Sequence, residues 1–143
     1  MEVDQAAPAI ASGRIEIAAE QQAVWDLLTD FERWPQWQSR VRSVSLDGEV
    51  EEGTVFRWKP GPTTITSTLH HVDAPREVGW TGKTVGISAV HVWRLHASEV
   101  GTSVATQESW DGRLVRLARG PMQKSLQKEI DAALEQLRAQ AER

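Results

Sequence analysis

The sequence predicts an α+β fold in which one antiparallel sheet packs on a long C-terminal helix. Three observations support this class. Segments with period-two alternation fill most of residues 41–110, a short amphipathic helical pattern precedes them, and a longer one ends the chain. Short turns join the successive strands, and strands joined in this way pair antiparallel. A chain of 143 residues with this order of elements is the size of one α+β domain.

The N-terminal residues differ from the rest of the chain. Residues 1–11 are polar and alanine-rich without periodicity, so we expect a flexible segment there and a single domain over residues 12–143. Residues 14–18 alternate as a first strand, with Ile15 and Ile17 on one face.

Two short helices should follow this strand. Apolar residues recur at helical spacing from about Glu20, which predicts an amphipathic helix that ends near Thr29. Residues 31–37 then form a short helical segment that Pro35 interrupts.

Six strands come next in a meander. Asp47-Gly48 and the Pro60-Gly61-Pro62 segment are turn signals between them, and β-branched residues favour strand in the third. The predicted strands cover residues 41–46, 54–59, 63–72, 77–81, 87–96 and 104–110.

The chain ends in helical pattern. A segment over residues 113–119 precedes a run over residues 121–141, which would be about 30 Å long as a helix. Pro121 suits its first turn, and Gly120 permits a bend before it. The side chains expected to face the sheet are those of Leu126, Ile130, Leu134 and Leu137.

Composition excludes several functional classes. The formal charge of −4 gives no basic footprint for nucleic acid. The absence of cysteine excludes thiol catalysis and cysteine-based zinc sites. No apolar run is long enough to span a bilayer and the N-terminus lacks a signal-peptide pattern, so we expect a cytoplasmic protein without stable membrane insertion. No cofactor fingerprint or metal-ligand spacing occurs, and we expect neither group.

Two neighbouring strands carry titratable residues on faces that are otherwise apolar. Alternation places His91 beside Trp93 on one strand, and Glu108 beside Trp110 on the next. A compact core would reject both titratable groups, whereas a sheet that lines a pocket accepts them. Glu108 close to His91 would raise the pKa of the imidazole and could form an acid/base dyad. The alternative is a buried histidine held by a hydrogen bond.

Aromatic side chains should surround this pair. Trp58, Trp80 and Trp93 form either a wall for a flat ligand or simple core packing. The segment of residues 34–37 could close one end of a cavity, or be an apolar plug without a ligand role. The opposite strand faces carry side chains expected to be solvated, namely Arg57, Lys59 and Arg94.

A basic cluster precedes the long helix. Arg113, Arg116 and Arg119 recur every three residues. They could attract an acidic ligand, a carrier-protein phosphopantetheine or an anionic head group, or they could form a solvated helix face.

The order of elements resembles a known family. The motifs that support this resemblance are VWDLLTDFERWPQW, the glycine-initiated strand GTVFRW, the proline before Arg76, the Gly101-Thr102 pair and the closing helix. Over residues 13–140 the chain is similar to the START-like, helix-grip (SRPBCC) superfamily, and within it to small bacterial proteins described as polyketide cyclase/dehydrase and lipid transport. The resemblance implies a curved sheet that grips the C-terminal helix, with a deep cavity for an apolar ligand between them. Members range from lipid carriers to aromatase/cyclases that act on carrier-protein-bound polyketides.

The leading hypothesis is a carrier or sensor that binds a small hydrophobic ligand, either a lipid, a polyketide or an aromatic molecule, as a monomer or weak dimer. The first alternative is a polyketide cyclase or aromatase with His91 or Glu108 as general acid/base and an acyl carrier protein as partner, although the tyrosines used by some cyclases are absent. The second is an interaction domain with a collapsed core. The expected ligand-binding residues are Trp58, Trp80, His91, Trp93, Glu108, Ser67, Leu69 and Trp37.

Overall fold

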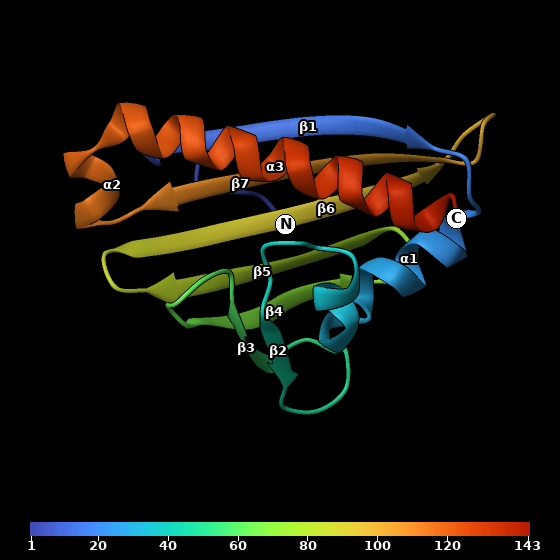
Figure 1. The fold of residues 1–143 in the computed structure, drawn as a ribbon, viewed down its shortest axis with the longest axis horizontal. Coiled ribbons are helices and arrows are strands. Elements are labelled where there is room, and N and C mark those ends of the chain that lie inside the picture. The colour runs from blue at the N-terminus through green and yellow to red at the C-terminus, as the bar shows by residue number, and fades with distance from the viewer.

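The structure, a computed structural model, describes residues 1–143 and shows a curved seven-stranded antiparallel sheet with a long C-terminal helix across it (Figure 1). The predicted fold class and the two short helices after the first strand are confirmed. None of the helices has the length and apolar character that a membrane span needs. The elements are β1 (Ala9–Ile17), α1 (Gln21–Thr29), the 3-10 helix η1 (Phe31–Gln36), β2 (Ser43–Leu46), β3 (Val55–Lys59), β4 (Ile65–Asp73), β5 (Glu77–Thr84), β6 (Ile87–Ala97), β7 (Thr102–Asp111), α2 (Arg113–Leu117) and α3 (Arg119–Ala141).

The strand order places the first strand beside the last. The sheet runs β1-β7-β6-β5-β4-β3-β2, so β2 to β7 form the predicted meander and β1 adds to its far edge. The register of this added pair runs from Ala9 opposite Trp110 to Ile17 opposite Thr102. All neighbouring strands are antiparallel.

The N-terminal segment is more integrated than the sequence predicted. Residues 9–11 belong to β1, so the expected flexible segment is wrong for them. Val3 is buried, and the amide of Asp4 donates to the Ser109 hydroxyl at 3.1 Å. This segment lies against the sheet face that carries Glu77 and Arg94, where Arg94 was expected to be solvated. The Arg94 guanidinium instead binds the Glu77 carboxylate at 2.9 Å and is only 28% exposed.

Helix α3 packs along β1 and β7 through one apolar stripe. The four side chains predicted to face the sheet are all buried: Leu126, Ile130, Leu134 and Leu137. The helix lies close to β1 at Gly13, where an added Cβ would lie 2.6 Å from Cδ1 of Leu134. The predicted bend before the helix occurs at Ala118, with φ −130° and ψ 51°, rather than at Gly120, which lies inside α3. Pro121 is in the first turn, as predicted.

The opposite part of the sheet is covered by aromatic side chains from η1. The ring of Phe31 lies 4.7 Å from that of Phe56 and 5.5 Å from that of Trp80, measured between centroids. The indole N–H of Trp34 donates to the carbonyl of Leu28 at 2.9 Å, which satisfies its only donor. The sheet is therefore densely packed under η1 and under α3, and the space between these two regions is where a cavity can remain.

The packing of α3 predicts unequal effects for two neighbouring residues. Leu134→Ala should lower the free energy of unfolding by about 2 to 5 kcal/mol, because it removes a side chain that is only 4% exposed. Glu135→Ala should change it by less than about 0.5 kcal/mol, since Glu135 is 61% exposed and pairs only with Arg138 at the surface. Urea titrations measure both values. Equal losses in the two variants would show that the helix register is wrong.

Candidate functional site

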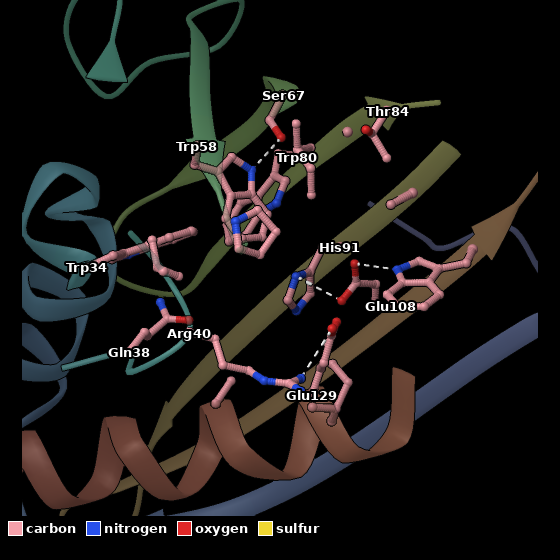
Figure 2. Close-up of a pocket in the computed structure, with 18 of the residues that line it drawn as sticks. Trp34, Gln38, Arg40, Trp58, Ser67, Trp80, Thr84, His91, Glu108 and Glu129 are labelled. Carbon is pink, nitrogen blue, oxygen red and sulfur yellow. Dashed lines mark hydrogen bonds and ion pairs between the residues drawn. The ribbon is translucent and has the colours of Figure 1, made fainter. Parts of the chain in front are cut away.

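A cavity of about 220 Å³ lies between the sheet and α3 (Figure 2). Twenty-four residues line it, and 12 of them are hydrophobic. They come from η1 and the loop after it, from strands β3 to β7 with the loop between β3 and β4, and from the middle of α3. The lining thus follows the gap between the two packed regions of the sheet.

Most of the predicted ligand-binding residues line this cavity. On β6, alternate side chains from Ile87 to Trp93 face it, as the period-two pattern predicted. Glu108 and Trp110 face it from β7. The predicted residues found in the lining are Trp58, Ser67, Trp80, His91, Trp93 and Glu108.

Leu69 and Trp37 do not line the cavity, and their prediction is corrected. Leu69 is fully buried in the hydrophobic core that also contains Phe31 and Phe56. Trp37 is 8% exposed and belongs to the same core. From the predicted plug of residues 34–37, only Trp34 reaches the cavity. Alternation identifies the face of a side chain but not whether another element covers it.

A continuous row of rings forms one wall of the cavity. The centroid of Trp34 lies 5.7 Å from that of Trp58 and 5.6 Å from that of Trp80. The imidazole of His91 continues the row at 5.0 Å from Trp80 and 5.3 Å from Trp93. These spacings lie within the range of favourable aromatic contacts, about 4.5–7 Å. The wall offers a broad apolar surface to a flat guest.

A directed chain of hydrogen bonds holds the titratable pair. The Thr106 hydroxyl donates its one proton to the carbonyl of Val92 at 2.9 Å. It therefore accepts from Nε2 of His91, also at 2.9 Å, and this nitrogen carries the imidazole proton. Nδ1 of the same ring lies 3.4 Å from Oε1 of Glu108, and Oε2 of Glu108 accepts from the indole N–H of Trp110 at 3.0 Å (Figure 2).

Burial keeps this pair uncharged. The side chains of His91 and Glu108 are 13% and 14% exposed. Loss of hydration lowers the pKa of His91 to about 3 and raises the pKa of Glu108 to about 8. The Trp110 N–H opposes the rise in the Glu108 pKa, and the nearby Glu129 carboxylate adds to it. The prediction that Glu108 raises the pKa of His91 is therefore wrong. The protonated carboxyl can instead donate to the free Nδ1 and complete the chain.

One side of the cavity is bridged by polar side chains. Arg40 Nη1 lies 3.4 Å from Glu129 Oε1. Gln136 contacts Ser39 twice, accepting from its amide N–H at 3.2 Å and donating to its hydroxyl at 3.0 Å. These contacts join the loop after η1 to α3. Burial raises the pKa of Glu129, and Arg40 opposes that rise.

Sequence reasoning missed this polar side of the cavity. Arg40 lies in a loop without periodicity, so no pattern assigned it a direction. On α3, Glu129, Ala133 and Gln136 are spaced by four and three residues and so share one face beside the buried leucines. That spacing could have indicated which face of the helix lines the cavity.

The basic cluster is separate from the cavity lining. Arg116 pairs with the Asp111 carboxylate at 2.8 Å, while Arg113 and Arg119 are exposed on α2 and at the start of α3. No group of three or more His, Asp or Glu side chains is arranged to hold a metal ion.

Comparison with known families identifies the family of this chain. Residues 8–142 match the family described as Polyketide cyclase / dehydrase and lipid transport. The chain belongs to this family. No curated protein matches its sequence.

Solved structures share the fold of this family member at low sequence identity. A hypothetical protein from Helicobacter pylori superposes with a TM-score of 0.85 at 14% identity, over 96% of this chain and 90% of that one. A START superfamily protein from Mycobacterium smegmatis gives 0.80 at 14% identity, over 93% and 97% of the two chains. The Zhui aromatase/cyclase from Streptomyces sp. R1128 gives 0.81 at 17% identity, over 94% and 93%. These similarities show the helix-grip fold.

The uncharged state of the pair predicts how stability depends on pH. The Glu108 pKa is about 8 when folded against 4.5 as its ordinary value, so the stability that this carboxyl contributes falls as pH rises through these limits. His91, with its pKa lowered from 6.5 to about 3, contributes a rise up to its ordinary pKa, so the net fall of the wild type lies between the ordinary pKa of His91 and the folded pKa of Glu108. The slope from this group is at most about 1.4 kcal/mol per pH unit. In Glu108→Gln the amide can donate to His91 and accept from Trp110, and this fall should disappear. Thermal melts from pH 5 to about pH 9 compare the two proteins. Parallel curves would contradict the neutral pair.

Proposed function

We propose that the protein is a cytoplasmic carrier or sensor that binds a small, uncharged and mostly apolar molecule in the cavity between the sheet and α3. One observation carries this proposal. The cavity has an aromatic wall, and the two titratable groups that β6 and β7 contribute to it, His91 and Glu108, are held in their neutral forms. Membership of a family described by polyketide cyclases and lipid transport supports the same class of ligand.

The volume of the cavity limits the size of the guest. About 220 Å³ is below the range of about 300–1,000 Å³ that is usual for drug-sized ligands. A guest with one or two rings, or a short branched chain, fits such a space. A complete phospholipid or a long polyketide chain would need the loop after η1 to move away from α3.

The polar groups of the lining favour a guest with one neutral oxygen function. The Ser67 hydroxyl accepts from the indole N–H of Trp58 at 3.1 Å and keeps its own proton to donate. The indole N–H of Trp93 is buried without an acceptor, which a guest oxygen could supply. An anionic guest would meet Glu108 and Glu129, while of the two cations in the lining Arg40 is paired with Glu129 and Lys83 is exposed to solvent. Burying a charge without a partner is strongly unfavourable.

The hydrogen-bond chain favours binding over catalysis. Both ring nitrogens of His91 are engaged, Nε2 with Thr106 and Nδ1 with Glu108. A general base needs a nitrogen that reaches the substrate proton, directly or through one water. We therefore assign His91 to the wall of the cavity, where it contributes its ring face and fixes the position of the Glu108 proton.

A cavity-filling substitution tests this proposal. Ala89→Phe should abolish calorimetric binding of 2-naphthalenemethanol, because Ala89 lines the cavity and the added ring would occupy it. Ser88→Phe is the matched control on the exposed face of β6 and should bind as the wild type does. The anionic analogue 2-naphthoate should bind at least about tenfold more weakly than the alcohol. Unchanged binding in Ala89→Phe would mean that the probe sits outside the cavity and that the proposal fails.

A cyclase or aromatase is the second candidate. The observation that favours it is the 3.4 Å contact between His91 and Glu108, two groups with opposite pKa shifts inside one cavity. Its substrate would be a polyketide delivered on an acyl carrier protein, which is the partner that this alternative requires.

Turnover separates the two candidates. With a poly-β-keto thioester, the carrier proposal predicts no acceleration of cyclisation by the wild type or by His91→Leu. The cyclase alternative predicts turnover that falls by about 10²- to 10⁴-fold in His91→Leu, the usual contribution of a general acid or base. Product analysis by mass spectrometry measures both proteins, and cyclisation that depends on His91 would replace the carrier proposal.

A further inference from the structure

One end of the molecule gathers most of its large exposed apolar side chains. Val85 is 92% exposed at the tip of the β5–β6 turn, and Leu117 and Leu114 of α2 are 86% and 41% exposed. Figure 1 shows that this turn and α2 lie together at one end, which we call the α2 end. Val100, the remaining large exposed apolar residue, is in the β6–β7 turn at the opposite end.

The turn and the helix form one fixed surface. The amide of Leu114 donates to the carbonyl of Gly86 at 3.2 Å. Gly112 and Gly86 both have positive φ, and a Cβ at Gly112 would lie 2.3 Å from the Gly86 oxygen. This close approach fixes α2 against the turn, so Val85 and the α2 leucines project together from the end of the sheet.

Basic side chains surround these projections. The charge of the whole chain is −4, yet the exposed charged residues nearest in sequence to Val85, Leu114 and Leu117 are mostly basic. The carboxylates facing them are Asp111, which pairs with Arg116 at 2.8 Å, and Asp4, which also acts on Arg116. The other exposed cations at this end are Lys83, Arg113, Arg119 and Lys124.

The α2 end is also continuous with the cavity. Thr84 and Ile87, on either side of the Val85–Gly86 turn, line the cavity, as does Trp110 at the end of β7. A molecule that leaves the cavity beside these residues would emerge next to the projecting side chains.

We propose that the α2 end docks the protein reversibly on an anionic membrane surface, with Val85 and Leu117 inserted between lipids and the surrounding cations on the head groups. This rests on the proposed function, since the membrane is where a small apolar guest would be exchanged. Side chains that project this far suit a fluid layer, which needs no complementary pocket. The side chains of Val85 and Leu117 together carry fewer aliphatic carbons than a myristoyl chain, and such a chain alone gives only marginal membrane binding. The surrounding cations must therefore contribute to the affinity, and the contact is transient.

Vesicle cosedimentation of the full chain tests this docking. The wild type should sediment with vesicles of phosphatidylglycerol and phosphatidylcholine in equal parts, much less with phosphatidylcholine alone, and less as salt is raised. Val85→Ser combined with Leu117→Ser should weaken binding at least about tenfold. Arg113→Glu combined with Arg119→Glu should do the same. Val100→Ser, at the opposite end, is the matched control and should bind as the wild type does.

Two outcomes would overturn the proposal. One is wild-type protein that stays in the supernatant with anionic vesicles, including the case in which the same surface binds an acidic acyl carrier protein instead. The other is a V85S/L117S protein that sediments as the wild type does. Calorimetry without vesicles keeps the proposed function separate, because V85S/L117S should still bind 2-naphthalenemethanol with unchanged affinity. Vesicle binding without any probe binding would support docking and reject the carrier function.

Discussion

The structure depends on the close packing of one helix along one edge of the sheet. Helix α3 buries its apolar stripe against β1 and β7, and it lies close to β1 at Gly13, where no side chain intervenes. A single helix, about 10–12 Å wide with its side chains, cannot cover seven strands spaced about 4.8 Å apart. The aromatic rings of η1 cover the far strands, and neither element fills the middle. The cavity is therefore a consequence of how the sheet is covered, and its lining is set by the strands that lie between the two covers.

The protonation states of the polar groups in the cavity follow from their loss of hydration. In water, His91 and Glu108 would be an ordinary ion pair, but away from water the loss of hydration outweighs their attraction and the proton stays on the carboxyl. Thr106 then fixes which ring nitrogen carries hydrogen, because its own proton is committed to the backbone. The result is a satisfied polar network among aromatic rings. Such a network tolerates a neutral guest and disfavours an anion, which is why geometry and electrostatics lead to the same class of ligand.

Local patterns predicted the fold class and most of the cavity wall. Alternation on β6 identified His91 and Trp93 because period two is a property of a single strand. The pairing of β1 with β7 was not predictable in this way, since it joins segments about ninety residues apart. The burial of Leu69, the direction of the His91 pKa shift and the contact of Arg40 with Glu129 also depend on distant segments. The sequence alone indicated which residues share a face of a strand or helix. Which of these faces another element covers, how far water is excluded from them and which distant residues form pairs could be learned only from the structure.

The most direct measurement is a crystal structure of the wild type grown with 2-naphthalenemethanol. We expect electron density for the ring system against the Trp80 face, opposite Ala133 of α3, with its oxygen within hydrogen-bond distance of Ser67, Trp93 or Glu108. Density only at the protein surface, or a structure in which Trp58, Trp80 and Trp93 close the space against α3, would contradict guest binding in the cavity.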